Sequence, residues 1–531
     1  MKLLPVDVSS FSTIIQGNYV YVDKTKYIYD LYSEGGRYHF LSRPRRFGKT
    51  LLVSTLHELF SGNKKLFKGL WIEKSDWQWK QYPVIHLDLA TTPCLSPQEL
   101  RDNINRALRR IALSYKLDIP KEDTPESTLV LMVNKLSELN GPSSVVILID
   151  EYDYPILKYL EHTEKAAAYR EILKSFYGTL KGLDKHLRAI FLTGVTKFAK
   201  TSIFSGLNNL NDISLKKEAS VLLGYTDQEI GKYFPEYIKN IAKKQDVSVP
   251  CIRKAMKQWY NGYSFSSADE SRVYNPFSVL YFLRDEEFHN YWFESGTPTF
   301  LIALLKTQFY SLNDLETSSM DRESLGTFEI NDIPLIPLLF QAGYLTIASY
   351  DKQTTLFTLD YPNEEVRLSV ARQLAAILSH AKPSEVPQVV VTLGKALRNN
   401  DAEAFCESIQ SLFANIPYNL HIAQEKYFHS LLQAIGMLLD AEVQSEVVTD
   451  KGRIDLVITT KTHVYVFELK FKATAETALA QIKRNKYYER FIIKRKKIVL
   501  IGLSFTYIKK KLKIRWKIEE QKPLAGTKKK N

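Results

Sequence analysis

Two groups of charged residues have the types and spacing that phosphate chemistry requires. The first is the segment RPRRFGKT (43–50), and the second is the pair of segments GRIDLVI (452–458) and HVYVFELKF (463–471). A lysine followed by a threonine at the start of a helix can bind phosphate and Mg²⁺, and two carboxylates beside a lysine can hold a metal ion at a phosphodiester. The sequence therefore indicates a nucleotide site near the N-terminus and a hydrolytic metal site near the C-terminus.

The GKT triplet contains the residues of a phosphate-binding loop. Backbone N–H groups around Gly48 would point at bound phosphate, Lys49 would add a positive charge, and the Thr50 hydroxyl would bind Mg²⁺. The general pattern has a glycine six residues before the lysine, where this chain has Arg43. The triplet alone could therefore be a chance match, and its position between a β-rich run and a helical run favours the phosphate loop.

An acidic pair that closes a β-rich run supplies the second half of a nucleotide site. The run VVILID (145–150) is followed by Glu151. Asp150 is expected to hold Mg²⁺ and Glu151 to polarise the attacking water, although such a pair can also be a solvated loop. Thr193 could sense the γ-phosphate or have a structural role. The residues expected to bind nucleotide are Arg45, Arg46, Gly48, Lys49, Thr50 and Asp150.

The C-terminal pair of segments can form a β-hairpin across a polar turn. If Lys461 and Thr462 form the turn, Asp455 lies opposite Glu468, with Cβ atoms about 4.5–5.5 Å apart. Because strand side chains alternate between faces, Lys470 shares a face with Glu468. Three charged groups on a mostly apolar face are costly unless they hold a metal or one another. We expect Asp455 and Glu468 to bind metal; an edge hairpin with an ordinary ion pair is the alternative.

Three further features could complete this hydrolytic site. Glu425 opens a helix predicted over 425–439 and could add a carboxylate or only compensate the helix dipole. Gln481, on a helix predicted over 475–490, could orient water or be solvated. The segment KLKIRWKI (511–518) alternates basic and apolar residues, which suits a strand along a phosphate backbone but also an edge strand protected from aggregation. The expected nucleic-acid contacts are Lys511, Lys513, Arg515 and Lys517.

Alternating strands and helices are expected to position the nucleotide site. Short β-rich runs at 38–42, 84–89, 145–150 and 189–194 are separated by helical segments, which is typical of a parallel sheet covered on both faces. Helix-like stretches then dominate, and strands return near the C-terminus. We expect three domains, which are a P-loop domain over 1–215, a mostly helical middle domain over 216–400 and an α/β domain with a basic tail over 401–531.

Composition limits the class of protein and its partners. The 531 residues are 45% hydrophobic, enough for more than one core, and the three cysteines form no metal-binding or disulfide pattern. No apolar run is long enough to span a membrane, so we expect a cytoplasmic protein. Residues 491–531 hold fourteen Lys and Arg against two Glu, which accounts for +12 of the net charge of +13. This basic segment could attract nucleic acid or anionic lipid, or act as a solvated tail.

Taken together, these strings resemble bacterial AAA-ATPase-like proteins that carry a C-terminal PD-(D/E)XK nuclease-like domain. The resemblance covers most of the chain. It rests on NYVYVDKT (18–25), RPRRFGKT (43–50), VVILIDEYDYP (145–155), FLTGVTKF (191–198), WYNGYSF (259–265), VYNPFS (273–278), GRIDLVI (452–458), FELKF (467–471) and QIKRNKYY (481–488). It implies a P-loop NTPase parallel sheet, a helical middle region and a C-terminal restriction-endonuclease-like α/β domain, with ATP and Mg²⁺ as cofactors.

The resemblance also implies roles for individual residues. It places Asp455, Glu468 and Lys470 in the nuclease core, and it adds Gln481 and Tyr487 from the accessory helix and Glu425 from the first helix. In this family the phosphate loop tends to have the sequence RPRRFGK, so the resemblance implies that Arg43 is a feature shared with other members. Ile454 stands where the superfamily's name has proline.

The hypothesis that follows is an ATP-binding protein, and an ATPase, that controls Mg²⁺-dependent cleavage of DNA, with a role in mobile elements or defence and a possible homo-oligomeric assembly. A second hypothesis is a nucleotide-binding module that grips nucleic acid or signals without cleaving it. A third, a membrane-surface protein held by its basic tail, is the least favoured.

Overall fold

The computed structural model forms two compact units. The first comprises Met1–Leu304 and Ser318–Val366, and the second comprises Leu305–Thr317 and Arg367–Asn531. The structure describes residues 1–33, 35–120, 124–197, 203–204, 207, 209–266, 271–294, 318–326, 334–380, 382, 384–413, 425–439, 441–449, 451–508 and 511–521. The three expected ranges, 1–215, 216–400 and 401–531, divide the chain by sequence pattern and stay a prediction; the last part of the basic tail lies outside the described residues.

A parallel five-stranded sheet is the centre of the first unit. Its strand order is β2-β3-β4-β1-β5, so β4 separates the strand that leads into the phosphate loop from the strand that ends in the acidic pair. All carboxyl ends of parallel strands lie at one edge, which is where the loops of both motifs emerge. The strands are β1 (Tyr38–Ser42), β2 (Val84–Asp88), β3 (Val145–Asp150), β4 (Leu187–Gly194) and β5 (Asn211–Asp212).

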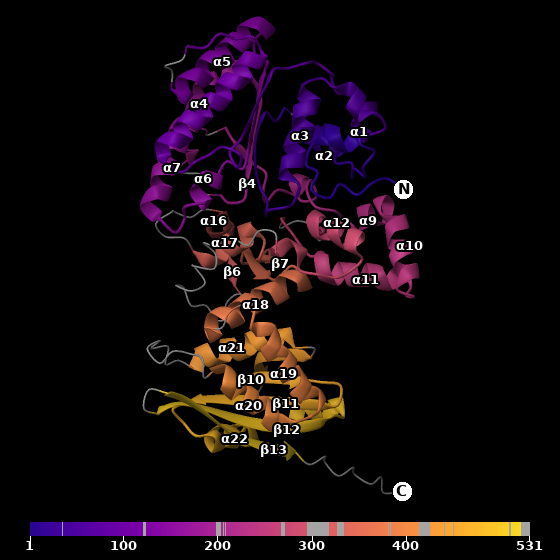
Figure 1. Cartoon of the computed structure of the whole chain (residues 1–531), viewed down its shortest axis with the longest axis vertical. Helices are drawn as coiled ribbons and strands as arrows, with labels where there is room; N and C mark the ends of the chain where they lie inside the picture. The colour runs from indigo at the N-terminus through magenta and orange to yellow at the C-terminus, as the bar shows by residue number, and fades with distance from the viewer. Residues whose placement is uncertain are drawn as a thin grey trace. The chain divides into compact units, whose positions relative to one another are not determined.

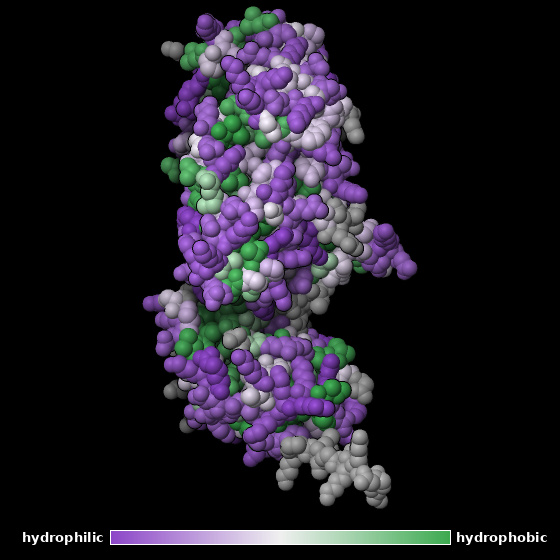
Figure 2. All heavy atoms as spheres, turned by 90° about the vertical axis from the view of Figure 1, so that its right-hand side faces the viewer, coloured by the Kyte–Doolittle hydropathy of each residue, from purple (hydrophilic) through white to green (hydrophobic). Residues whose placement is uncertain are grey.

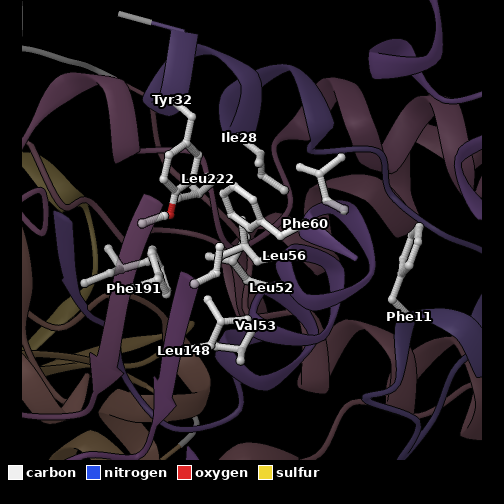
Figure 3. Packing of buried hydrophobic residues seen from close by; sticks show 14 of the residues in the cluster. Phe11, Ile28, Tyr32, Leu52, Val53, Leu56, Phe60, Leu148, Phe191 and Leu222 are labelled. Carbon is white, nitrogen blue, oxygen red and sulfur yellow. The ribbon is translucent and has the colours of Figure 1, made fainter. Parts of the chain in front are cut away.

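Helices cover both faces of this sheet, as the alternating pattern predicts. Helices α1, α2 and α3 lie on one side of β4, and α4, α5 and α7 lie on the other (Figure 1). Apolar residues of α3 recur every three or four positions, and Figure 3 shows Leu52, Leu56 and Phe60 packed toward Leu148 of β3 and Phe191 of β4. The helices are α1 (Phe11–Gln16), α2 (Thr25–Ser33), α3 (Lys49–Phe60), α4 (Pro97–Ser114), α5 (Pro125–Asn140), α6 (Tyr154–Leu157) and α7 (Thr163–Gly178), with 3₁₀ turns η1 (Lys64–Phe67), η2 (Trp71–Lys74) and η3 (Thr179–His186).

The rest of the first unit is mostly helical and is tied to the sheet by the segment NYVYVDKT. Lys24 bonds to the Val221 carbonyl and forms a largely buried ion pair with Glu229 at 2.7 Å. Glu229 also completes a capping box with Thr226 at the start of α9. The elements are η4 (Lys217–Ala219), α9 (Asp227–Tyr233), α10 (Pro235–Lys244), α11 (Val249–Tyr260), α12 (Pro276–Asp285), α13 (Tyr291–Glu294), α16 (Arg322–Gly326), α17 (Leu335–Ala342) and an antiparallel sheet of β6 (Ser319–Met320), β8 (Leu356–Asp360) and β7 (Thr346–Asp351).

The second unit is a mixed sheet with helices on both faces. Its strand order is β13-β12-β11-β10-β9, and only β11 and β12 pair in parallel. Helix α22 packs on one face against Val464 and Val466, while Phe428 of α21 stacks on Phe505 at the other. The elements are α18 (Glu364–Ser379), α19 (Val386–Arg398), α20 (Ala402–Phe413), α21 (Glu425–Leu438), β9 (Glu442–Thr449), β10 (Gly452–Thr459), β11 (His463–Phe471), α22 (Ala475–Arg484), η5 (Glu489–Lys494), β12 (Lys497–Ile508) and β13 (Lys511–Gln521).

The hairpin of β10 and β11 has the register that the sequence predicts. Leu456 pairs with Phe467 and Thr459 with Val464, so Lys461 and Thr462 form the turn. The helix predicted over 475–490 is shorter than expected. It ends at Arg484, and a left-handed residue at Lys486, with φ of 52°, turns the chain toward η5. The pattern of charges gave no sign of this early end.

Surface and helix composition agree with the absence of long apolar runs in the sequence. Hydrophilic residues cover most of the face drawn in Figure 2, with small apolar patches between them. Among the described residues, no helix combines the length and the apolar content needed to cross a bilayer.

Gly502 allows α22 to lie close to the sheet, and this contact can be tested. A Cβ atom at Gly502 would lie 2.3 Å from the Ala475 carbonyl oxygen and 2.7 Å from the Leu479 backbone nitrogen. Gly502→Ala should therefore lower the free energy of unfolding of the second unit by about 1–3 kcal/mol, since α22 must shift outward. The control is Gly394→Ala in α19, where the nearest atom is 3.4 Å away at the tip of Arg398. Calorimetry of the full chain should show loss only for Gly502→Ala; equal melting of both variants would contradict this packing.

Candidate functional site

The phosphate loop joins β1 to α3 through two left-handed residues. Arg46 has φ of 65° and Gly48 has φ of 91°, and Gly48 is the N-cap of α3. A glycine adopts this conformation without the strain that a Cβ would cause. Lys49 and Thr50 are consequently the first two residues of α3, at the helix end where N–H groups are available to an anion.

The Lys49 ammonium is buried and held by acceptors at the loop. Its side chain is 3% exposed, and Nζ lies 3.2 Å from both the Arg43 and Pro44 carbonyl oxygens. It also forms an ion pair with the Glu151 carboxylate at 3.1 Å. The structure therefore brings together the lysine and the glutamate that the sequence predicts to work on one nucleotide.

Asp150, at the end of β3, has an incompletely bonded carboxylate. The residue is fully buried, Oδ1 accepts a hydrogen bond from the Glu151 backbone N–H, and Oδ2 has no partner among the described residues. Burial, followed by the nearby Glu151 charge, raises the pKa of Asp150 to about 6, while Thr50 and Lys49 act in the opposite direction. Thr193 has a structural contact, since its hydroxyl donates to the Leu41 carbonyl at 2.8 Å between β4 and β1.

Arg43 occupies the position of the first loop glycine and points away from the phosphate side chains. Its guanidinium is 1% exposed and donates to the carbonyls of Ser42, Ser214 and Ala219 at 2.8–2.9 Å. It also stacks at 4.0 Å over the Phe265 ring of the segment WYNGYSF. Burial lowers the pKa of Arg43 to about 9. Arg43 therefore joins the phosphate loop to the segments that follow the sheet.

A cavity of about 450 Å³ opens beside the phosphate loop. One part is lined by phosphate-loop and acidic residues, and the other part is apolar and aromatic. Arg46 extends over the Phe277 ring at 4.9 Å, Phe277 contacts Tyr281 at 4.3 Å, and the Tyr281 hydroxyl donates to Asp7 at 2.8 Å. The lining residues include Val6, Val8, Arg45, Gly48, Lys49, Thr50, Asp88, Glu151, Pro276 and Leu280. The size and this division between charged and apolar walls suit a nucleotide.

In the second unit, Asp455 lies at an irregular point of β10. The residues on either side pair with β9 through Ile454–Val447 and Leu456–Ser445. The Asp455 side chain is half-buried, and its Oδ2 accepts the Leu469 backbone N–H at 2.7 Å. The carboxylate therefore lies against the backbone of β11, next to Glu468.

Glu468 and Lys470 form a tight ion pair on the same strand. Lys470 Nζ lies 2.7 Å from Glu468 Oε1 and 3.1 Å from the Leu469 carbonyl oxygen. The Glu468 side chain is 1% exposed and that of Lys470 is 21% exposed. Asp455 is thus bonded to β11 at Leu469, the residue between Glu468 and Lys470. Among the described pairs the β10–β11 ladder ends at Leu456–Phe467, so the predicted pairing of Asp455 with Glu468 stays a prediction.

The remaining predicted residues differ in how well the structure supports their placement. Gln481 lies half-buried on α22. Tyr487 is buried against Ile454, and its hydroxyl accepts a hydrogen bond from Asn485 at 2.9 Å, which is a packing role. Glu425 opens α21 as expected. The side chains of Glu425 and Lys511 lie outside the described residues, so their roles stay predictions.

The basic strand β13 shares a sheet face with the charged group on β11. Lys470 pairs with Ser504 of β12, and Ser504 pairs with Arg515 of β13. In the neighbouring row, Glu468 pairs with Gly502, and Gly502 pairs with Lys517. Residues in one row point to the same face, and two strand spacings amount to about 10 Å. Arg515 and Lys517 are exposed, as is Lys513 one step along the strand. The start of α22 packs over Gly502 between these two groups, so it separates the basic side chains from the carboxylate site.

Comparisons with known proteins match both units. The family described as Predicted AAA-ATPase matches residues 5–204, and the PD-(D/E)XK nuclease superfamily matches residues 423–516. A protein of Azotobacter chroococcum mcd 1, named "Uncharacterized protein in vnfD 5'region", is 35% identical over 517 residues, covering 95% of this chain and 96% of the relative. The chain belongs to this AAA-ATPase-like family with a PD-(D/E)XK nuclease superfamily domain. No solved structure shows a significant match.

Families of these two kinds generally use nucleotide and a divalent metal, and the donor atoms here fit such an ion. Asp455 and Glu468 offer carboxylate oxygens, the ligands that hard divalent cations prefer. In the part of the chain that the structure describes, no cluster of three or more His, Cys, Asp and Glu side chains could hold a metal. Water, a backbone carbonyl or substrate phosphate would therefore have to complete the coordination.

Asp88 is a site residue that the sequence reasoning missed. It ends β2, pairs with Asp150 across the parallel ladder and lines the same cavity as Thr50 and Glu151. Burial raises the pKa of Asp88, with a further contribution from Glu151. The sequence contains a pattern that could have indicated Asp88, because VIHLDL (84–89) is a β-rich run with an acidic residue near its end, as in VVILID.

The buried Asp150 carboxyl predicts a trade-off between stability and function. Its folded pKa of about 6 exceeds the value of about 3.9 for an exposed aspartate, so wild-type stability falls as pH rises from about 4 to about 6. Asp150→Asn lacks this loss and should be more stable at pH 7.5 by up to about 3 kcal/mol, with a smaller gain at pH 5. Urea denaturation at both pH values measures the difference. The control, Asp118→Asn, removes an exposed carboxylate and should change little; a destabilised Asp150→Asn at pH 7.5 would refute the prediction.

Proposed function

We propose that this protein binds and hydrolyses ATP at the phosphate loop, and that the nucleotide controls Mg²⁺-dependent cleavage of DNA by the second unit. The observation that carries the proposal is the arrangement of Asp455, Glu468 and Lys470. A nearly fully buried glutamate, a lysine bonded to it and a carboxylate bonded to the adjacent backbone are costly to place inside a sheet. Metal-dependent phosphodiester hydrolysis uses such a group, and the superfamily match supports this chemistry.

The nuclease residues would divide the work by their positions. Mg²⁺ held by Asp455 and Glu468 would supply positive charge to the scissile phosphate and lower the pKa of a bound water. Lys470 Nζ, which is already near both Glu468 and the Leu469 carbonyl, would orient the attacking water and stabilise the negative charge that develops. The Leu469 N–H keeps the Asp455 carboxylate turned toward β11 throughout.

On the nucleotide side, partner exchange at Lys49 would link binding to hydrolysis. A bound triphosphate offers oxygens that can replace the Arg43 and Pro44 carbonyls and the Glu151 carboxylate as partners of Lys49. Glu151 would then be released to polarise the attacking water. Asp150 and Thr50 would hold Mg²⁺, and Arg45 and Arg46 would contact phosphate.

The basic strand β13 gives the proposed substrate a path. Lys513, Arg515 and Lys517 are exposed on the sheet face that carries Glu468 and Lys470, and successive side chains on one face of a strand are about 6.6 Å apart. A phosphate backbone lying along β13 would run on one side of α22, with the carboxylates on its other side. By family resemblance, we further propose a cytoplasmic homo-oligomer that acts in mobile-element or defence functions.

A second candidate is a nucleotide-dependent nucleic-acid-binding or signalling module without cleavage. Two observations favour it. Lys470 is already paired with Glu468, and the described residues contain no group of three or more His, Cys, Asp or Glu that could hold a metal. In this case the hairpin would be a structural ion pair and the basic strand would provide affinity alone.

Cleavage and nucleotide binding can be separated by variants of the full chain. Asp455→Ala and Lys470→Ala should each abolish Mg²⁺-dependent cutting of DNA while ATP affinity is unchanged, because the two sites lie in different units. Lys49→Ala should weaken ATP binding by at least about 100-fold through loss of a buried charge partner of phosphate. A gel assay of DNA nicking and fluorescence titration with an ATP analogue measure these effects.

The control for these variants is Lys494→Ala, which removes a lysine of the second unit that pairs with Glu442 and should leave both activities intact. If wild-type protein cuts neither single-stranded nor double-stranded DNA or RNA with ATP and Mg²⁺ present, the cleavage proposal fails and the binding module is favoured.

The path along β13 predicts a particular salt dependence. Replacing Lys513, Arg515 and Lys517 by alanine should weaken DNA binding at all sequences and reduce the slope of log affinity against log salt by about 2–3, because three phosphate contacts are lost. Fluorescence anisotropy between 50 and 200 mM salt measures the slope. The control replaces Lys243, Lys254 and Lys257, exposed on α10 and α11, and removes the same charge. Equal slopes for both triple variants would show only a general charge effect.

A further inference from the structure

We propose that His429 is a positioning residue of the nuclease site, which fixes the backbone of Asp455 so that its carboxylate faces β11. The proposal rests on the proposed function, because Asp455 is taken as a metal-binding residue. Its structural part, the effect of His429 on Asp455, stands on hydrogen bonds and can be measured without any cleavage.

The first observation is the local break in β10. Ile454 pairs with Val447 and Leu456 with Ser445, but the ladder with β9 contains no pairing of Asp455 itself. Opposite this position, Glu446 has a left-handed φ of 47°. Ile454 and Val457 nevertheless belong to the same apolar cluster, although residues three apart point to opposite faces of a regular strand. The strand therefore departs from regular pairing at Asp455.

The second observation is a contact at this irregular position. His429 of α21 is 6% exposed, and its Nε2 lies 2.6 Å from the Asp455 carbonyl oxygen. A carbonyl oxygen only accepts hydrogen bonds, so Nε2 must carry the proton and donate it. On the other side of the residue, Asp455 Oδ2 accepts the Leu469 N–H at 2.7 Å. Two bonds from two different elements thus hold the backbone and the side chain of one residue.

The position of His429 on α21 makes this contact specific. His429 and Gln433 are one helical turn apart and both are buried, at 6% and 2% exposure, on a helix that packs against β10 and β11. Buried polar side chains are costly unless bonded, and an apolar residue would satisfy packing equally well at position 429. The hydrogen bond to the Asp455 carbonyl therefore explains why a histidine occupies this position. Partners of metal-binding residues that fix orientation typically affect metal affinity or activity by about 10–100-fold.

The test compares His429→Leu, which fills the space without a donor, with His429→Gln, whose amide nitrogen can reach the same carbonyl. In the full chain, Mn²⁺ binding attributable to this site is the part that Asp455→Ala removes. His429→Leu should weaken that binding by about 10–100-fold and lower kcat of DNA cleavage with KM for DNA little changed. His429→Gln should stay within about threefold of wild type.

Hydrogen exchange at the Leu469 amide gives a readout that does not depend on metal or cleavage. His429→Leu should accelerate this exchange by at least about tenfold, since a mobile Asp455 no longer holds the Leu469 N–H, and His429→Gln should restore protection. Unchanged Leu469 exchange and Mn²⁺ affinity in His429→Leu would overturn the proposal, and so would equal damage in both variants, which would point to ring packing. If wild-type protein binds no Mn²⁺ and cuts no nucleic acid, the proposed function fails, while Leu469 exchange still decides whether His429 positions Asp455.

Discussion

The need to pair buried charge is the constraint on which both sites depend. Lys49 and Glu468 are almost fully buried, at 3% and 1% exposure, and each is stable there only because an opposite charge and hydrogen-bonding groups surround it. The parallel sheet of the first unit meets this need by ending β1 and β3 at the same edge, so that Lys49 reaches Glu151. The mixed sheet of the second unit meets it within one strand, where Glu468 and Lys470 point to the same face. Each fold therefore brings its charged residues together as a consequence of strand order or strand alternation.

The parts of this arrangement that depend on local periodicity could be predicted from the sequence. The strands around 38–42 and 145–150, the helix after the phosphate loop and the register of the β10–β11 hairpin follow from apolar pattern and turn position, because these act over a few residues. The placement of Glu468 and Lys470 on one face of β11 belongs to this class. The structure adds the irregularity at Asp455, which pattern alone does not indicate since Ile454 and Leu456 read as an ordinary alternating strand.

Contacts between residues far apart in sequence could not be predicted. From the sequence, Arg43 is only a residue that departs from the general phosphate-loop pattern. In the structure its guanidinium donates to the Ser214 and Ala219 carbonyls, which lie more than 170 residues further along the chain. His429 and Asp455 are 26 residues apart on different elements, and no periodicity relates a helix face to one carbonyl of a strand. Asp88 is an intermediate case. Neighbouring parallel strands end at the same edge of a sheet, so knowing that β2 lies next to β3 would have placed Asp88 beside Asp150. In each case the missing information is the tertiary pairing rather than the chemistry of the residue.

The two sites also share a consequence of buried pairing. In each, the lysine expected to interact with phosphate is bonded to the carboxylate expected to work beside it, Lys49 to Glu151 and Lys470 to Glu468. A lysine taken from its carboxylate without a substitute would leave two unpaired charges, which is strongly unfavourable. A phosphate group can replace the carboxylate as partner of either lysine, and in the second unit a metal ion can replace the lysine as partner of Glu468. On the proposed function, this exchange of partners would link substrate binding to metal binding at Glu468 and would link triphosphate binding to the release of Glu151 in the first unit.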